Sequence, residues 1–250
     1  MPRLNDNDDL QTFQIGGNFN FQGARIANLG ATEYTLVTIA VDVSGSVAGF
    51  KKELRQSLVT AVDACRKSPR SDNILLRVVT FPKFMNTGVE EMHGFKPLSD
   101  VDPAAYPDLN VGGGTPLCDA CYSAIGAINS YGEQLSDQDF GVNGIAFIIT
   151  DGGENTSKAT MKMVRDEAER SVSGEILESM ITVLIGINAS ALNKELERFR
   201  REAGLTQYID AGDATPKKLA KLADFVSQSV SSQSQALGTG GPSRNIAAVI

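Results

Sequence analysis

The sequence predicts an α/β fold: a doubly wound, mostly parallel sheet with helices on both of its faces. Four short stretches are rich in β-branched and apolar residues, as strands covered on both sides are; they are residues 36–42, 74–81, 145–151 and 181–187. Segments with helical spacing of apolar residues lie between them. Strands that alternate with helices are joined by right-handed crossovers, which makes the strands parallel and gives a Rossmann-like arrangement.

Five predicted helices fill the intervals between and after these strands. Each carries an apolar residue at about every third or fourth position, which gives the helix one face that packs onto a sheet. Their apolar stripes begin at Phe50, Cys118, Met161, Leu192 and Leu219. Two weaker strands complete the pattern. Residues 88–98 are expected to form a short edge strand, and residues 207–210 a further short strand.

The two ends of the chain fall outside this alternation. Residues 1–33 form an N-terminal extension with large apolar residues around a Gly-Gly pair, which favours a small hairpin or an added edge strand. Residues 34–230 make up the α/β domain. Residues 231–250 are a tail rich in Ser, Gln and Gly that ends in apolar residues. This tail is either disordered or a short segment that docks as a strand.

Composition and charge exclude several classes of protein. The 250 residues are 42% hydrophobic, which is enough for one substantial core. A formal net charge of −7 argues against nucleic acid as a partner, because phosphate binding needs clustered Lys and Arg. No apolar run approaches the ~18–20 residues of a membrane helix, so no membrane insertion is expected. With three cysteines and no secretory signal at its start, the sequence predicts a cytoplasmic protein.

Three loops that carry glycine and oxygen-bearing side chains are expected to meet at one edge of the sheet. Asp42, Ser44 and Ser46 follow the first predicted strand, and Asp151 ends the third. Thr115 lies between them in the sequence, after three glycines and before a predicted helix. In a parallel sheet these loops lie at the carboxyl ends of the strands, which is where ligands bind. The sequence therefore predicts a ligand site at this edge.

The five side chains offer two carboxylates and three hydroxyls, with no nitrogen or sulfur. Hard oxygen ligands suit Mg²⁺, Mn²⁺ or Ca²⁺ better than zinc, and Mg²⁺ is the first expectation. Two carboxylates roughly neutralise the ion, and the weak hydroxyl ligands leave it able to attract another anionic oxygen. We therefore expect a divalent cation and a protein partner that offers an Asp or Glu carboxylate, with no catalytic and no cofactor-binding residues.

Each loop taken alone also has a structural interpretation. Ser44 or Ser46 can cap the helix that follows, and Thr115 with its following proline is a good helix start. Asp151 with its following glycine can form a turn. Three such loops in this order, each after the appropriate element, favour the metal site over three unrelated caps.

Other polar signals in the sequence carry less weight. Cys118 and Cys121 form a C-x-x-C pair at a helix start, but both lie on the apolar stripe, which favours a place in the core. A zinc site that adds Cys65 and His93 is disfavoured, because Cys65 lies on the stripe of another helix. Glu154, just beyond the third loop, either influences the choice of partner or is an exposed carboxylate.

The three loops together resemble those of a von Willebrand factor type A domain. That family's metal-ion-dependent adhesion site (MIDAS) has Asp-x-Ser-x-Ser after the first strand, a Thr in the second loop and an Asp in the third. All five positions match here, at Asp42, Ser44, Ser46, Thr115 and Asp151, and the resemblance covers about residues 34–230. It implies direct metal contact for the serines and the threonine, and contact partly through water for the aspartates. In some members the threonine switches its contact as the last helix moves.

Residues 112–117, Gly-Gly-Gly-Thr-Pro-Leu, are most similar to small prokaryotic intracellular members such as those associated with tellurite resistance. The resemblance implies a non-enzymatic, metal-dependent protein-binding module within a bacterial stress-response or defence system of several proteins. Two alternatives remain. One is a structural subunit of an assembly held by its terminal segments. The other is a metal-dependent hydrolase, which the lack of a positioned base or anion-binding Arg beside the predicted ligands disfavours.

Overall fold

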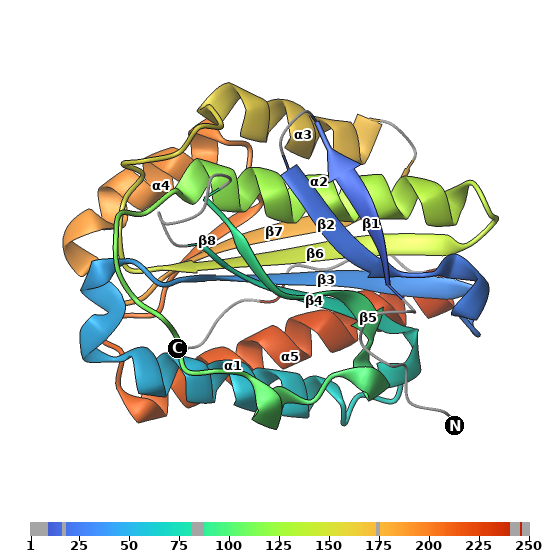
Figure 1. The fold of residues 1–250 in the computed structure, drawn as a ribbon, viewed down its shortest axis with the longest axis horizontal. Helices are drawn as coiled ribbons and strands as arrows, with labels where there is room; N and C mark the ends of the chain where they lie inside the picture. Colours follow the sequence, from blue (N-terminus) through green and yellow to red (C-terminus); the bar gives the residue numbers. More distant parts are fainter. Residues whose placement is uncertain (1–9, 17–18, 82–87, 174–175, 241–245, 247–250) are drawn as a thin grey trace.

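The computed structural model describes residues 10–16, 19–81, 88–173, 176–240 and 246. Within this part of the chain a run of neighbouring strands shares one direction: β3 (Glu33–Asp42), β4 (Ile74–Phe81), β6 (Gly141–Thr150), β7 (Met180–Gly186) and, at the edge, β8 (Gln207–Asp210). β5 (Glu90–Pro97) runs antiparallel to β4. The mostly parallel α/β sheet predicted from the sequence is confirmed (Figure 1).

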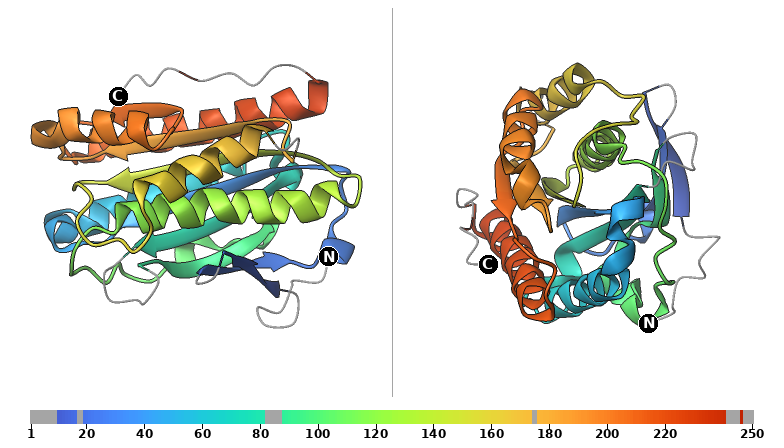
Figure 2. Two further views of the ribbon diagram at one scale, coloured as in Figure 1. Left: turned by 90° about the horizontal axis from the view of Figure 1, so that it is seen from above. Right: turned by 90° about the vertical axis from the view of Figure 1, so that its left-hand side faces the viewer.

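Two layers of helices cover the sheet, one on each face (Figures 1 and 2). One face carries α1 (Lys51–Cys65) and α5 (Pro216–Thr239), which pack against each other. The other carries α2 (Leu117–Ser136), α3 (Met161–Ser173) and α4 (Asn193–Glu202). None of the described helices is both long and apolar enough to span a membrane.

The central strand β3 shows why the strand segments read as almost continuously apolar. Leu36 and Ala40 belong to the core under α2, whereas Val37 and Ile39 belong to the core under α1 and α5. Successive side chains of a strand point to opposite faces, so a strand covered on both sides needs apolar residues at odd and even positions alike. β3 pairs with β4 on one side and β6 on the other, which places its carboxyl end in the middle of the sheet edge.

An N-terminal hairpin extends the sheet beyond β5. β1 (Leu10–Ile15) and β2 (Phe19–Ala24) are antiparallel, and Gly23 of β2 pairs with Phe95 of β5. Residues 88–98 therefore contain an internal strand, not the edge strand that the sequence predicted. β2 and β5 approach so closely that a β carbon at Gly94 would collide with the backbone carbonyl of Gln22. The aromatic residues of the hairpin are buried in the core of the molecule, with the rings of Phe13 and Phe21 stacked 5.1 Å apart.

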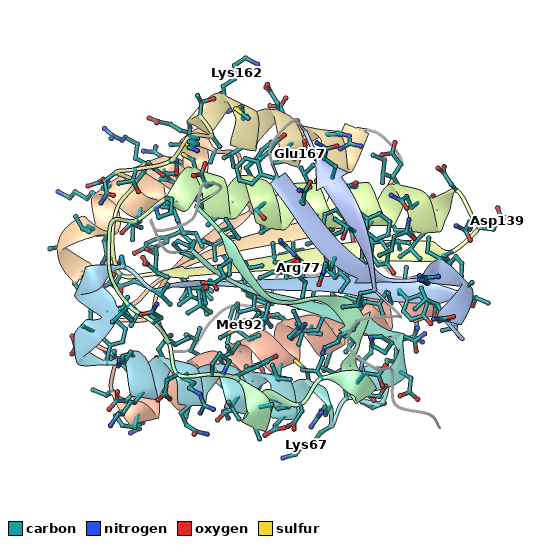
Figure 3. The ribbon with its side chains drawn as sticks, in the orientation of Figure 1. Lys67, Arg77, Met92, Asp139, Lys162 and Glu167 are labelled. Carbon is teal, nitrogen blue, oxygen red and sulfur yellow. The ribbon has the colours of Figure 1, made fainter. Side chains whose placement is uncertain are left out.

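A buried arginine lies at the centre of this hairpin side of the molecule (Figure 3). Arg77 of β4 is 1% exposed, and its Nε donates to Glu91 Oε1 at 2.5 Å. Its other nitrogens donate to the backbone oxygen of Ser123 (3.3 Å) and to Ser123 Oγ (3.1 Å) on α2. Glu91 also accepts from the backbone nitrogen of Gln22 at 3.1 Å. This ion pair joins β4, β5, α2 and the hairpin, and no feature of the sequence identified it.

The last helix is longer than the predicted domain boundary at residue 230 allows. α5 runs to Thr239 and ends at Gly240, whose φ of +63° is the left-handed conformation that glycine adopts easily. Gln233 is fully buried. Its backbone carbonyl accepts from Asn143 Nδ2 at 2.8 Å, and its side-chain Nε2 donates to Ser179 Oγ at 2.9 Å. The sequence composition placed residues 231–239 in the tail, because polar residues that pack against the sheet leave no apolar stripe to indicate a helix.

The predicted docking of the C-terminal residues falls mainly outside the described part of the chain. Ile246 is the exception. It packs at the edge of the core under α1 and α5, and its carbonyl accepts from Gln207 Nε2 of β8 at 3.4 Å.

Candidate metal centre

The predicted ligands lie at the carboxyl edge of the sheet, on the left-hand side of Figure 1 and towards the viewer in the right-hand view of Figure 2. Asp42 is the last residue of β3, and Asp151 directly follows β6, the neighbouring parallel strand. Ser44 and Ser46 lie at the start of the short 3₁₀ segment Gly45–Gly49 that leads into α1. Thr115 lies two residues before α2.

The first loop folds back on the carboxylate that precedes it. The backbone nitrogen of Ser44 donates to Asp42 Oδ1 at 2.7 Å, and the hydroxyl oxygens of Ser44 and Ser46 are 3.1 Å apart. Asp42 is 1% exposed, and its Oδ2 accepts from Thr150 Oγ1 at 2.6 Å. Burial raises the pKa of Asp42 to about 6, although the hydrogen bonds from Thr150 and Ser44 oppose this shift.

A side-chain hydrogen bond joins the first loop to the third. Ser46 Oγ donates to Asp151 Oδ1 at 2.7 Å. Partial burial raises the pKa of Asp151, and the charge of Asp151 in turn contributes to the raised pKa of Asp42. Two carboxylates therefore lie close enough to repel each other, in surroundings that disfavour their ionised forms. A bound cation would relieve both effects.

Thr115 is brought against the third loop. Its side chain is buried, and a β carbon built at Gly152 would lie 3.0 Å from Thr115 Oγ1, so glycine at 152 allows the close approach. The glycines before Thr115 join the second loop to the first. Gly112 donates its N–H to the carbonyl of Val43 at 2.8 Å, and Gly45 donates to the carbonyl of Gly113 at 3.3 Å. The structure thus brings together loops that are more than 100 residues apart in sequence.

The chemistry of these donors fits a hard divalent cation. Two carboxylates and three hydroxyls from Asp42, Ser44, Ser46, Thr115 and Asp151 converge, and all are oxygens, which Mg²⁺, Mn²⁺ and Ca²⁺ prefer. Within the described residues no group of three or more His, Cys, Asp or Glu side chains is arranged to hold a metal. A site of the thiolate or imidazole type is therefore not present in this part of the chain.

An open hollow of about 460 Å³ lies directly beside these residues. Ser46 and Asp151 form one wall, and the loops after β7 and β8 form the other, with Asn188, Asp213 and Thr215. Asn188 fixes this second wall, because its Oδ1 accepts from the backbone nitrogen of Ala214 at 2.7 Å. The described residues that line the hollow include no Lys, Arg or His.

Several residues that shape the site were not identified from the sequence. Thr150 holds Asp42, and Asn155 binds the backbone of Thr115. Glu154 was expected to contact partners or to be an exposed carboxylate. Instead it is half-buried and accepts from the backbone nitrogens of Cys118 (2.7 Å), Thr156 (2.9 Å) and Ser157 (2.8 Å). In the sequence Glu154 and Asn155 are visible only as part of a polar segment after Asp151, and such a segment does not indicate which side chains point inward.

The cysteines and the histidine take no part in the site. Cys118 and Cys121 are buried in the core under α2, as predicted, and burial raises the pKa of Cys118 to about 12. Cys65 belongs to the core on the opposite face of the sheet. His93 Nε2 lies 2.9 Å from the hydroxyl of Tyr106, and the two rings are stacked. A zinc site would need Cys65, His93, Cys118 and Cys121 together, but Cys65 lies on the opposite face of the sheet from Cys118 and Cys121.

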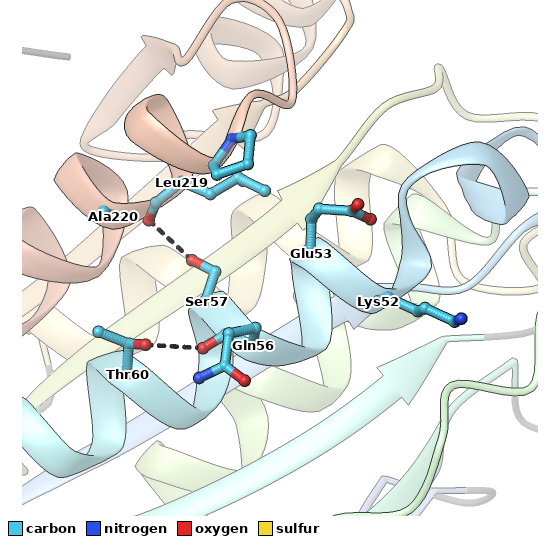
Figure 4. A pocket seen from close by; sticks show the side chains of 8 residues that line it. Lys52, Glu53, Gln56, Ser57, Thr60, Leu219 and Ala220 are labelled. Carbon is cyan, nitrogen blue, oxygen red and sulfur yellow. Dashed lines mark hydrogen bonds between the residues drawn. The ribbon is translucent and has the colours of Figure 1, made fainter.

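A second depression, of about 340 Å³, lies between the first turns of α1 and α5 (Figure 4). Ser57 on α1 donates to the carbonyl of Leu219 on α5 at 2.9 Å across its floor. Lys52 and Pro216 line this depression. They follow closely in sequence on Phe50 and Thr215, which line the hollow beside the predicted ligands. None of the predicted ligands lines this groove.

No protein-family model and no curated protein matches the chain. Among solved structures, the fold is similar to the pilus adhesin SpaC from Lactobacillus rhamnosus GG in its open conformation, with a TM-score of 0.59 and 11% identity. That match covers 85% of this chain and 31% of the adhesin. Proximal thread matrix protein 1 from the mussel byssus gives a TM-score of 0.54 and 16% identity, covering 80% of this chain and 47% of that one.

A further structure of the mussel protein has a zinc-occupied MIDAS motif, and it matches with a TM-score of 0.52 and 16% identity over 80% of this chain and 46% of that one. At such low identity these likenesses show the fold, which is of the von Willebrand factor type A kind. The chain spans between about a third and a half of the length of these neighbours.

Proposed function

We propose that this chain is a divalent-metal-dependent module that binds a protein partner. Asp42, Ser44, Ser46, Thr115 and Asp151 form a complete MIDAS in this proposal, with Mg²⁺ as the expected ion and Mn²⁺ or Ca²⁺ as alternatives. The observation that carries it is the hydrogen bond between Ser46 and Asp151. It brings hydroxyl and carboxylate oxygens of two loops within 2.7 Å of each other at the sheet edge.

The partner's contribution follows from the charges at the site. Asp42 and Asp151 supply two negative charges, which balance a divalent cation, and the remaining donors are neutral hydroxyls. The ion then keeps much of its attraction for another anionic oxygen, and the open hollow beside Ser46 and Asp151 leaves one side accessible. We infer that a partner Asp or Glu carboxylate approaches from this hollow and completes the coordination.

Binding is favoured over hydrolysis because the described lining of the hollow has no Lys, Arg or His to clamp a phosphate, and its one carboxylate besides Asp151, Asp213, is exposed. The alternative of a structural subunit held by its ends has less support. The hairpin strands β1 and β2 pair with each other and with β5, and their aromatic residues are buried in the protein's own core, which gives this part of the N-terminal extension a role within the fold. The cytoplasmic location and the role in a stress-response or defence system stay predictions from the sequence.

Calorimetric titration with Mg²⁺, combined with a pull-down in Mg²⁺ or in chelator, tests the proposal. Asp151→Ala is expected to weaken Mg²⁺ binding at least about 100-fold, a larger loss than the 10–100-fold typical of residues that only support ligands. The fold should survive, because Asp151 is only partly buried and its ionised form is disfavoured there.

Asp137→Ala is the matched control, since Asp137 is an exposed aspartate that follows α2 at the opposite end of that helix. It should bind Mg²⁺ like the unmodified protein. Partner capture that survives both chelation and Asp151→Ala would overturn the proposal. Metal-dependent turnover of a panel of phosphoesters would favour the hydrolase instead.

A further inference from the structure

Asn155 of the third loop joins that loop to the second through two hydrogen bonds with the backbone of Thr115. Asn155 Oδ1 accepts from the backbone nitrogen of Thr115 at 2.8 Å, and the backbone nitrogen of Asn155 donates to the carbonyl of Thr115 at 3.2 Å. The residue before Thr115 must be small for this contact, because a β carbon at Gly114 would lie 2.6 Å from Asn155 Oδ1. Asn155 therefore holds Thr115 from both of its backbone groups.

The third loop is in turn fixed to the first turn of α2 by two carboxylates. Glu154 accepts from the backbone nitrogen of Cys118 at 2.7 Å and from Ser157 Oγ at 2.6 Å. Asp119 is 1% exposed and accepts from the backbone nitrogens of Lys158 (3.0 Å) and Ala159 (2.7 Å). Negative charge is also favourable at this end of the helix, where unpaired N–H groups point outward. Residues 154–159 and the start of α2 thus form one hydrogen-bonded unit.

The first loop has no comparable attachment. Among the described residues, its hydrogen bonds to the other loops are the Ser46–Asp151 bond and the two backbone bonds of Gly45 and Gly112. Asp42, just before this loop, accepts from Thr150 at the end of β6. No carboxylate of the second or third loop accepts backbone N–H groups from the segment Gly45–Gly49 among the hydrogen bonds of the described residues. The three loops therefore differ in how they are held. Thr115 and Asp151 belong to loops that are hydrogen-bonded to each other and to the start of α2, whereas Ser44 and Ser46 lie on a loop that leads into α1.

We propose that Asn155 is a positioning residue for the metal. It fixes the oxygen of Thr115 relative to Asp151, so that these two donors keep one spacing instead of rearranging independently. The proposal rests on the metal site proposed above and adds to it that the second and third loops act as a single preformed half of that site. Any adjustment during binding then falls to the first loop.

Calorimetric titration with Mg²⁺ on the full chain tests this role. Asn155→Ala removes the acceptor for the Thr115 N–H and should weaken Mg²⁺ binding about 10–100-fold, as loss of a residue that orients a ligand does. Asn155→Asp keeps an acceptor oxygen at the same place and should remain within about threefold of the unmodified protein. Asn110→Ala is the control, because Asn110 is an exposed asparagine that precedes the same glycines.

Hydrogen exchange of the Thr115 amide gives a second readout that does not depend on bound metal. It should become faster in Asn155→Ala, with the amides of the central strands unchanged. Unchanged Mg²⁺ affinity in Asn155→Ala would overturn the proposal, as would a loss that Asn155→Asp does not restore. If Asp151→Ala also leaves Mg²⁺ binding intact, the metal site itself is wrong. If Asp151→Ala abolishes binding while Asn155→Ala does not, only the positioning role fails.

Discussion

Two regions of this molecule hold buried charge, and they differ in whether the protein neutralises it. On the hairpin side, Arg77 is paired with Glu91 and also donates to Ser123, so a positive and a negative group meet inside the fold. At the sheet edge, the hydrogen bonds of Asp42 and Asp151 within the described part of the chain come from hydroxyls and backbone N–H groups, and the two carboxylates repel each other. The first region needs nothing from outside, whereas the second gains from a cation.

Burial disfavours the charged form in both regions, which lowers the pKa of a base and raises the pKa of an acid. Burial lowers the pKa of Arg77, while the charge of Glu91 and its hydrogen bond act against that shift. For Asp42 the largest effect is burial, which raises the pKa to about 6, and Asp151 adds to the rise. A buried ion pair is a structural feature whose removal damages the fold. Two neighbouring carboxylates with raised pKa values are typical of a ligand site, because a bound cation can supply the missing charge.

The largest effect on stability is expected from removing one partner of the Arg77–Glu91 ion pair. Glu91→Ala leaves Arg77 buried without its counter-ion, and loss of one partner of a buried pair costs about 3–5 kcal/mol in the free energy of unfolding. Urea denaturation followed by circular dichroism measures this. Glu90→Ala, at the exposed neighbouring position of the same strand, is the control and should lie within about 0.5 kcal/mol of the unmodified protein. Equal stabilities for the two variants would contradict the comparison.

A change of pH should act on the sheet edge through Asp42. Mg²⁺ needs the ionised carboxylate, so protons compete with the metal below about pH 6, the pKa that burial gives Asp42. Affinity measured by calorimetry should be nearly constant above pH 7 and about tenfold weaker one unit below the pKa. An affinity that stays constant between pH 7 and pH 5 would show that Asp42 does not have to ionise for binding.

The same shift has the opposite sign for the stability of the metal-free protein. The pKa of Asp42 is higher in the folded state than its ordinary value of 3.8, so the folded state binds the proton more tightly than the unfolded state. The contribution of Asp42 to stability therefore grows as the pH falls from about 6 towards 3.8. Saturating Mg²⁺ should stabilise the protein most above pH 6, which thermal unfolding with and without the metal can measure.

The smallest expected effect concerns the wall of the hollow opposite the proposed ligands. Asp213 is exposed and lines the hollow with Asp151, so Asp213→Lys should weaken Mg²⁺ binding about two- to threefold at low salt, with the difference fading as salt screens it. Asp224→Lys makes the same charge change at an exposed position of α5 outside the hollow. If both variants weaken binding equally, the effect belongs to net charge and not to the hollow.

Much of the fold could be predicted because it depends on local patterns. The parallel strands are apolar at consecutive positions since both faces are covered, and the helices carry single stripes since one face is. The hairpin could be anticipated from apolar residues around Gly16, but its pairing with β5 could not, because the ladder pair described between them, Gly23 with Phe95, has no sequence pattern. For the same reason β5 was expected at the edge of the sheet.

The candidate site shows the same limit at the level of single residues. Asp42, Ser44, Ser46, Thr115 and Asp151 could be named because each occupies a recognisable place after a strand or before a helix. Asn155 and Glu154 could not be assigned, since an Asn or Glu in a polar loop has the same appearance whether it points into solvent or onto backbone N–H groups. Gln233 was assigned to the tail for a similar reason, although its backbone carbonyl accepts from Asn143 and its Nε2 donates to Ser179.

The sequence by itself determined which elements form, the order in which they alternate and which oxygen-bearing residues end at one edge of the sheet. These depend on periodicity and on the rule that parallel strands share a carboxyl edge. The tertiary structure alone decided which loops are bound to each other, which carboxylates turn inward and which buried charges are neutralised. Those outcomes depend on contacts between residues as distant as Ser46 and Asp151, or Arg77 and Ser123, for which the chain carries no local signal.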